Sequence, residues 1–346
     1  MKSKRIKNRN TIALPLQDVE SVSITILMDN CTDFLLANSP YAKRPPLIVN
    51  EKYNLPAPVA EHGFSALIST FAKDNKNIDT FLFDAGVSEN GVIHNADLLG
   101  IRFDMIDGII LSHGHFDHFT GLANVLKRIS SKRSSTVDIF SHPDSFLRRW
   151  EIYPDGKRAR LPFLDEKQLK ELGATIHKNS GVRLLPTDTS SSLLITGEIP
   201  RNTSFEKGFP FQYAEKPQNN NDNDEKNRNL IPDPLVKDDQ AIVVNVRNKG
   251  LVVMTGCGHA GIINTVNYAQ KVTGINKVCA VIGGFHLPAD DGIFEKAIDS
   301  TLKELQKIDP KYIVPCHCTG WKATNKIIDL MPNKFIQSAV CTTFTF

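Results

Sequence analysis

The sequence lacks the features that would place the chain in a membrane, on a nucleic acid or in an oxidising compartment. No apolar run approaches the roughly 20 residues of a membrane-spanning helix, and residues 11–15, after a basic start, are too short for a signal-peptide core. The formal net charge is only +3 over 346 residues, too small to indicate a nucleic-acid partner. The 6 cysteines contain no CxxC pair, so we expect thiols in a reducing cytosol.

These absences predict a cytoplasmic protein without membrane or nucleic-acid partners. They leave open whether the chain forms a homo-oligomer. The apolar content of 41% and charged content of 23% are typical of globular proteins. We expect a basic flexible arm over residues 1–20 and a single domain over 21–346. Residues 218–229 contain no apolar side chain, which predicts a disordered insertion at about 216–232 inside that domain.

The apolar pattern alternates strands with helices and predicts the α/β class. Strands are expected over 22–28, 64–70, 80–84, 107–112, 137–140, 241–246, 251–254, 278–282 and 312–314, with shorter ones within 180–196. Helices are expected over 93–99, 120–129, 264–271, 294–308 and 322–330. Residues 31–60 contain five prolines and no clear period, which indicates a long loop that can shape a binding pocket.

One short segment carries most of the chemical information. After the apolar run 109–111, the chain reads Ser-His-Gly-His-Phe-Asp-His and offers His113, His115, Asp117 and His118 as metal ligands. The whole chain has only 10 histidines, so three of them beside an aspartate in one loop are unlike a chance arrangement. The pattern predicts two divalent metal ions, roughly 3.5–4 Å apart.

This His-x-His-x-Asp-His segment after a strand resembles the signature of the metallo-β-lactamase superfamily. Three other segments fit the same family in order along the chain: Asp84-Ala85-Gly86, the strand that ends at Cys257, and the last strand with His317 at its end. The resemblance covers about residues 22–346. It implies a four-layer αββα sandwich of two mixed sheets.

Four further motifs resemble the branch of that superfamily that contains the dihydropterin synthase of methanopterin biosynthesis. They are Glu61-His62-Gly63-Phe64-Ser65, Gly256-Cys257-Gly258-His259-Ala260-Gly261-Ile262, Gly283-Gly284-Phe285-His286-Leu287 and His317-Cys318-Thr319-Gly320. Most members of the branch are described only as metal-dependent hydrolases, and the synthase joins an aminobenzene ribofuranosyl phosphate to a pterin.

The resemblance therefore implies a binuclear, metal-dependent hydrolase-like enzyme. Metal-bound hydroxide or metal Lewis acidity would act on a small substrate, phosphorylated or pterin-like. The alternatives are a dihydropterin-type synthase and a non-catalytic metal-binding sensor or scaffold. Two divalent ions are implied as cofactors, zinc foremost, with iron or manganese as alternatives.

The ligands divide between two positions. We expect His113 and His115 at the first metal, and Asp117 and His118 at the second, where the resemblance adds His317. The third-histidine segment of the superfamily is missing, because residues 238–240 read Asp-Asp-Gln at its place. His259, just past a strand end in a glycine-rich turn, is our choice for the first metal's third ligand.

Other residues are given supporting roles. Cys257 stands at the position of the bridging ligand, where a thiolate favours zinc; alternatively it is buried and inert while Asp239 ligates. Asp84 is expected to orient a ligating histidine. Asp117 and His286 are the catalytic candidates, although His286 can equally be a histidine packed under its turn.

The remaining motifs point more weakly to the site. Glu61 and His62 either line the pocket or play a capping or surface role. Cys316 and Cys318 flank His317 and are expected to be structural, because alternation would point them away from it. The run GCGHAG over 256–261 matches a dinucleotide-binding pattern in spacing only, so its glycines are interpreted as allowing close approach to a metal or phosphate.

Overall fold

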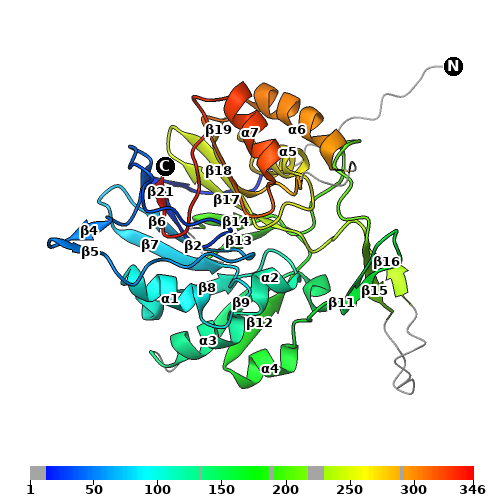
Figure 1. Ribbon diagram of the computed structural model, residues 1–346, viewed down its shortest axis with the longest axis horizontal. Helices are drawn as coiled ribbons and strands as arrows, with labels where there is room; N and C mark the ends of the chain where they lie inside the picture. Colours follow the sequence, from blue (N-terminus) through cyan, green and yellow to red (C-terminus); the bar gives the residue numbers. More distant parts are fainter. Residues whose placement is uncertain (1–12, 133–134, 187–190, 217–229, 289–291, 293) are drawn as a thin grey trace.

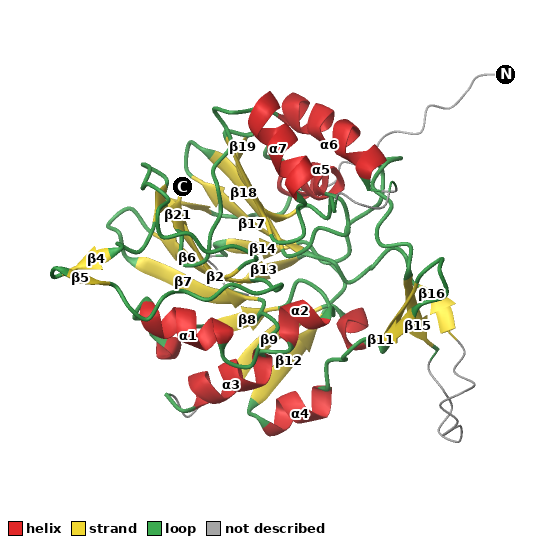
Figure 2. Ribbon diagram, viewed as in Figure 1, coloured by secondary structure: helices red, strands yellow, loops and turns green. Residues whose placement is uncertain are grey.

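The computed structural model describes residues 13–132, 135–186, 191–216, 230–288, 292 and 294–346. Two large mixed sheets lie face to face and helices cover both outer surfaces, which confirms the predicted αββα sandwich (Figures 1 and 2). Among the described helices, none combines the length and the apolar character that crossing a bilayer requires.

The first sheet has eight strands in the order β12-β9-β8-β7-β6-β2-β21-β3. Strands β7, β8, β9 and β12 run parallel, so their carboxyl ends lie at one edge. The bounds are β2 (Ser21–Met28), β3 (Ala42–Lys43), β6 (Ser65–Phe71), β7 (Asn77–Phe83), β8 (Gly108–Ile110), β9 (Val137–Ser141), β12 (Ala174–Lys178) and β21 (Thr343–Thr345).

The second sheet follows the order β13-β14-β17-β18-β19-β20, with β1 (Asp18–Val19) beside β17. Strands β18, β19 and β20 are parallel and also gather their carboxyl ends at one edge. The bounds are β13 (Arg183–Leu185), β14 (Leu193–Ile195), β17 (Ala241–Val246), β18 (Gly250–Thr255), β19 (Val278–Gly284) and β20 (Tyr312–Cys316).

The main core lies between the two sheets. Along β2 the side chains alternate between buried and half-buried, as expected for a strand with one face on the core. Ile24 and Phe81 of the first sheet and Ile242 and Met254 of the second belong to this one apolar cluster. Because this cluster is buried between the two sheets, it fixes the register of each strand. A one-residue slip would turn the apolar side chains of that strand outward.

Helices close the outer faces through two further apolar clusters. Helices α5 (Ile262–Thr273), α6 (Glu295–Ile308) and α7 (Trp321–Leu330) pack on the second sheet. Helices α1 (Gly91–Leu98), α3 (Leu122–Ser130) and α4 (Glu166–Glu171) pack on the first. The short α2 (Phe116–Phe119) and the 3-10 turns Phe103–Met105 and Pro143–Phe146 complete the described helices.

Several elements differ from the sequence-based expectation. A small four-stranded sheet extends to the right of the sandwich in Figure 1, with the order β11-β10-β15-β16. Its strands, which we did not predict, are β10 (Arg149–Ile152), β11 (Arg158–Arg160), β15 (Gln212–Glu215) and β16 (Leu230–Pro232). Within the long loop 31–60, a hairpin of β4 (Ile48–Val49) and β5 (Lys52–Tyr53) forms.

The expected arm and insertion lie partly outside the described residues, namely at 1–12 and 217–229. Residues 13–20, which composition assigns to the arm, contact the domain: Leu14 N donates to Val272 O at 2.9 Å, Leu16 is buried and β1 pairs with β17. Residues 230–232, assigned to the insertion, form β16 and pair with β15.

Candidate metal centre

The loops after the strand ends bring the candidate residues together. Asp84 follows β7, His113 follows β8, Cys257 follows β18, His286 follows β19 and His317 follows β20. Asp84, His286 and His317 have φ angles of 59°, 44° and 49°. This left-handed conformation is uncommon outside glycine and concentrates at functional sites. The chain thus turns sharply as it leaves β7, β19 and β20.

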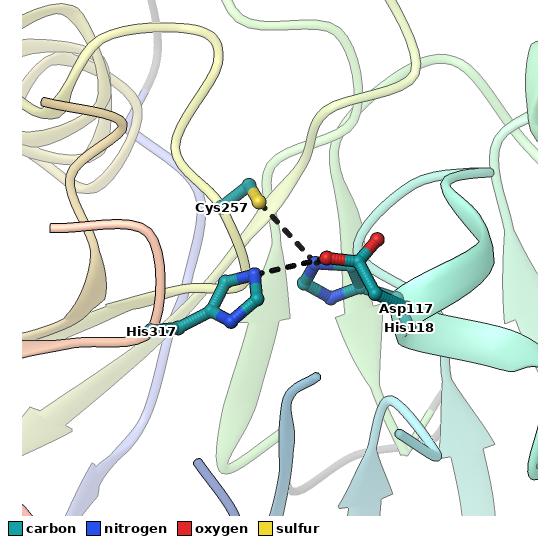
Figure 3. Close-up of side chains that lie close together, drawn as sticks. All are labelled: Asp117, His118, Cys257 and His317. Atoms are coloured by element: carbon teal, nitrogen blue, oxygen red, sulfur yellow. Dashed lines mark hydrogen bonds and ion pairs between the residues drawn. The ribbon is translucent and has the colours of Figure 1, made fainter. Parts of the chain in front are cut away.

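The first donor set consists of Asp117, His118, Cys257 and His317, all buried, with one ligand atom of each within 4.8 Å of the others (Figure 3). His118 Nε2 lies 3.3 Å from Cys257 Sγ, and His317 Nε2 lies 3.2 Å from Asp117 Oδ2. Two imidazoles, a carboxylate and a thiol are ligands that zinc takes in four-coordinate sites. The donor chemistry therefore fits a divalent ion.

The second donor set consists of His113, Cys257 and His259, again within 4.8 Å of one another. His113 Nε2 and His259 Nδ1 are buried and have no hydrogen-bond partner among the described residues. A buried unpaired polar nitrogen is costly, and a bound cation would satisfy both. Cys257 belongs to both sets, where the resemblance implies a bridging ligand; its ligation of a metal stays a prediction.

His115 lies beside the second set rather than within it. Its Nδ1 is 3.0 Å from His259 Nε2, and its Nε2 contacts Gln212 Oε1. Its ring centroid is 4.5 Å from that of His113. The placement of His113 and His115 on one metal stays a prediction, because His115 can join only by exchanging one of these contacts for the ion.

A third set contains Cys257, His286 and Cys318. Cys318 Sγ donates to Cys257 O at 3.1 Å, so its side chain lies against the donor sets, contrary to the direction that strand alternation predicts; its structural role stays a prediction. Strand alternation ends at Cys316, and the left-handed turn at His317 redirects the following residue. Cys316 itself remains in the core between the sheets. Both ring nitrogens of His286 are buried without a hydrogen-bond partner among the described residues.

Asp84 contacts His118 directly and His113 through Ser112. Its Oδ2 lies 2.6 Å from His118 Nδ1 and accepts from Ser112 Oγ at 2.7 Å, while Oδ1 accepts from Ser112 N at 2.7 Å. Ser112 Oγ also lies 2.8 Å from His113 Nδ1. These contacts turn the other nitrogen of each ring towards the donor sets, which is how a carboxylate orients a metal-binding histidine.

The first set is strongly coupled electrostatically. Burial lowers the pKa of His118, but the carboxylates of Asp117 and Asp84 outweigh burial and raise it to about 9. Burial raises the pKa of Asp117, yet His118 and His317 together hold it below its usual range. Asp117 is therefore ionised at neutral pH, and His118 would have to release a proton to bind a metal.

The second set favours neutral imidazoles. Burial, followed by the neighbouring His118 and His115, holds the pKa of His113 well below its ordinary value. Burial, followed by His286 and His115, does the same for His259. Neutral imidazole is the form that binds a metal. Burial also raises the pKa of the Cys257 thiol, so ligation there requires a cation to displace its proton.

The segment at 238–240, where the superfamily's third histidine is absent, has other partners. Asp238 pairs with the buried Arg149 at 2.5 Å and accepts from Gly114 N at 2.7 Å. Gln240 Nε2 donates to Leu111 O at 2.7 Å. Asp239 Oδ2 accepts from Ala260 N at 2.7 Å, while its Oδ1 is buried without a partner among the described residues. Asp239 lies in none of the donor sets, and burial raises its pKa to about 6.

Arg149 and Gln212 are site neighbours that the sequence did not reveal. Both lie on the small sheet, in β10 and β15, and Arg149 also donates to Asp233 at 3.1 Å. Gln212 holds His115, and Arg149 holds Asp238 under the metal loop. No spacing pattern marks either residue.

His62 lies at the entrance of the site. Its side chain is 67% exposed, and its Nε2 lies 3.6 Å from Asp117 Oδ2. Glu61 instead holds the following loop, because its Oε1 accepts from Val87 N at 2.8 Å and from Ser88 N at 3.1 Å.

A buried carboxylate occupies the amino terminus of α5, where a dinucleotide phosphate would bind. The Glu206 oxygens accept from Ile263 N at 2.8 Å and Asn264 N at 2.9 Å. A side chain on Gly261 would collide with this carboxylate. Gly261 therefore makes room for the Glu206 carboxylate and not for the metal or phosphate that we expected beside it.

Comparisons with known proteins agree with this geometry. Residues 74–202 match the family model described as the metallo-beta-lactamase superfamily. The 7,8-dihydropterin-6-methyl-4-(beta-D-ribofuranosyl)-aminobenzene-5'-phosphate synthase of Methanocaldococcus jannaschii is 33% identical over 278 residues, covering 80% of this chain and 87% of that protein. An uncharacterized protein of the same organism is 31% identical over 286 residues, covering 81% of this chain and 92% of its own.

Among solved structures, Tm1679, described as a metal-dependent hydrolase of the beta-lactamase superfamily, superposes with a TM-score of 0.66. The superposition covers 93% of this chain and 98% of that chain at 21% sequence identity, so it shows a shared fold. Together with the identity to the curated relatives, it establishes that the chain belongs to the metallo-beta-lactamase superfamily, in the branch that includes the dihydropterin-linked synthase.

Proposed function

We propose that this protein is an enzyme that holds two divalent metal ions, zinc foremost, and acts on a small, phosphorylated or pterin-like substrate in the cytosol. The observation that carries the proposal is the convergence of two buried donor sets on Cys257. The unpaired nitrogens of His113 and His259 support it further, because an apolar or purely structural site would not retain them.

In this proposal, Asp117, His118, Cys257 and His317 hold one ion, and His113, Cys257 and His259 hold the other. Ions bound here would supply Lewis acidity and lower the pKa of a bound water. Asp84 keeps His118 in the tautomer that presents Nε2. His286, whose ring nitrogens are buried without a hydrogen-bond partner among the described residues, would move a proton to or from the substrate.

A specific observation favours a second candidate, the synthase reaction. The named relative is 33% identical across most of both chains. In a hydrolase, water would attack the substrate. In a synthase, the amine nitrogen of the aminobenzene partner would bond to the 6-methyl carbon of the pterin and lose its proton, while that carbon's leaving group departs with the bonding electron pair.

Metal content and turnover test the proposal together. Protein purified without chelator should contain near two metal ions per chain by inductively coupled plasma mass spectrometry, and His113→Ala should lower that number. Turnover would be screened with a generic phosphodiester, a lactone, and a dihydropterin activated at its 6-methyl carbon, with and without an aminobenzene ribofuranosyl phosphate. Trace metal in the reconstituted wild type would refute the proposal, and metal without turnover on any of these substrates would favour the sensor or scaffold alternative.

A further inference from the structure

A cavity beside the metal centre has the size and lining of a ring-binding pocket. It measures about 230 Å³ and lies between the carboxyl end of β20, helix α7 and the segment at residues 29–31. Pockets that enclose whole drug-sized ligands span roughly 300–1,000 Å³. A cavity of this size therefore suits one part of a substrate, such as a fused pair of rings.

We propose that this cavity binds the fused pterin-type ring of the substrate, with Trp321 as the aromatic side chain against which the ring stacks. The inference rests on the proposed function, since the ring class follows from the substrate class proposed there. It goes further by assigning that ring to one pocket and one stacking residue.

The face of α7 towards the cavity is unusual for its exposed apolar surface. Trp321 is 72% exposed although tryptophan is among the residues that gain most from burial. Trp321, Thr324 and Ile328 all line the cavity, as their helical spacing allows. Ile328 is 36% exposed, so the exposed apolar surface continues along this face of the helix. A flat ring lying on this face would remove it from water.

The other walls provide polar groups. Gln337 contributes an amide side chain, Thr324 a hydroxyl and Phe335 a second aromatic ring, while the Asn30 amide is already engaged with His317. Apolar faces combined with amide and hydroxyl groups fit a nitrogen heterocycle, which has flat apolar faces and hydrogen-bonding edges. A plain benzene ring would leave these polar groups without a matching edge, which favours the pterin over the aminobenzene part.

The cavity and the metal centre share His317. This residue lines the cavity, and its Nε2 lies 3.2 Å from Asp117 Oδ2 in the first donor set. Its backbone is fixed from the cavity side, because Asp29 Oδ1 accepts from His317 N at 2.8 Å and Asn30 Nδ2 donates to His317 O at 2.9 Å. A ring in the cavity would thus hold its attached reacting group beside the metal ligands.

The test is binding of 6-methylpterin to the full-length, metal-loaded protein by isothermal titration calorimetry. Alanine substitution of a stacking aromatic weakens binding of a flat base by roughly 5- to 150-fold. Trp321→Ala should therefore raise the Kd about tenfold or more. The matched control is Leu330→Ala, at the end of the same helix, where the side chain is 51% exposed and outside the cavity lining; it should leave the Kd unchanged.

A second readout separates stacking from misfolding. Trp150→Phe leaves Trp321 as the only tryptophan of the chain, which has 2. Saturable quenching of its emission by 6-methylpterin, at the concentration seen by calorimetry, would support the inference. Equal affinity of the wild type and Trp321→Ala would overturn it, as would absence of binding, or Trp321-dependent binding of 4-aminobenzoate in place of the pterin.

These outcomes are distinguishable from failure of the proposed function. Trp321-dependent pterin binding in a protein without turnover would preserve the pocket and refute the enzyme. Turnover with unchanged KM in Trp321→Ala would preserve the enzyme and refute the pocket.

Discussion

Replacing Asp84 by Asn should weaken metal binding 10- to 100-fold while leaving the fold intact. The carboxylate is fully buried and serves the Ser112 N–H, the Ser112 hydroxyl and His118 Nδ1. An amide has only one oxygen. With that oxygen on the Ser112 N–H, the NH₂ group faces His118 Nδ1 and forces the proton onto Nε2, the nitrogen that a metal needs. With the amide reversed, two donors face each other at Ser112.

The expected loss of metal affinity can be estimated in two ways. An unsatisfied buried donor costs about 1–3 kcal/mol, and loss of an orienting partner lowers metal affinity by roughly 10- to 100-fold, or about 1.4–2.7 kcal/mol. Backbone strain does not confuse the test, because asparagine also tolerates the left-handed conformation found at Asp84, where φ is 59°.

The assay is a competition titration of Zn²⁺ against a chromophoric chelator, with wild type, Asp84→Asn and a control. Asp79→Asn serves as the control, since Asp79 is a buried carboxylate on β7, the strand that Asp84 follows, and accepts from Ser192 Oγ at 2.5 Å, away from the donor sets. If the Zn²⁺ affinity of Asp84→Asn lies within threefold of the affinities of the wild type and of Asp79→Asn, the Asp84 carboxylate does not orient a metal ligand.

Three further predictions address single residues. In Co²⁺-loaded protein, the sulfur-to-metal charge-transfer absorption should disappear in Cys257→Ser and persist in Cys318→Ser; persistence in both would make Cys257 inert. His286→Gln should lower kcat by roughly 10²- to 10⁴-fold at unchanged metal content, and an unchanged kcat would assign it a packing role. Because burial raises the pKa of Asp239 from 3.8 to about 6, its ionisation costs nothing below pH 4 and at most about 3 kcal/mol above pH 6. Asp239→Asn should therefore raise Tm at pH 8 more than at pH 4, and loss of metal would instead identify Asp239 as a ligand.

The strand ends were the part of the site most open to prediction. An apolar run followed by polar side chains marks where a buried strand ends, and parallel strands bring such ends to one edge. Strand ends located His113 from the sequence alone, whereas the resemblance supplied Cys257 and His317; the structure places Cys257 in one donor set with His113 and in another with His317. Their roles as ligands stay predictions until metal is measured.

Residues beyond the last strand position, and residues on the small sheet, were not predictable in this way. Cys318 follows a left-handed turn at His317, and no alternation rule survives such a turn. The strand Arg158–Arg160 is exposed along its whole length, so no apolar pattern in the sequence predicts it. It forms because β10 offers a partner, and β10 and β15 then carry Arg149 and Gln212 to the site.

The shared sulfur of Cys257 has a thermodynamic consequence. If both donor sets bind metal through it, the two binding events cannot be independent, because the first ion fixes the charge and position of a ligand that the second requires. The coupling free energy is reciprocal, so each ion alters the affinity of the other by the same factor. Metal titrations of this protein should then deviate from two independent isotherms, and damage to either half of the centre should be felt by both.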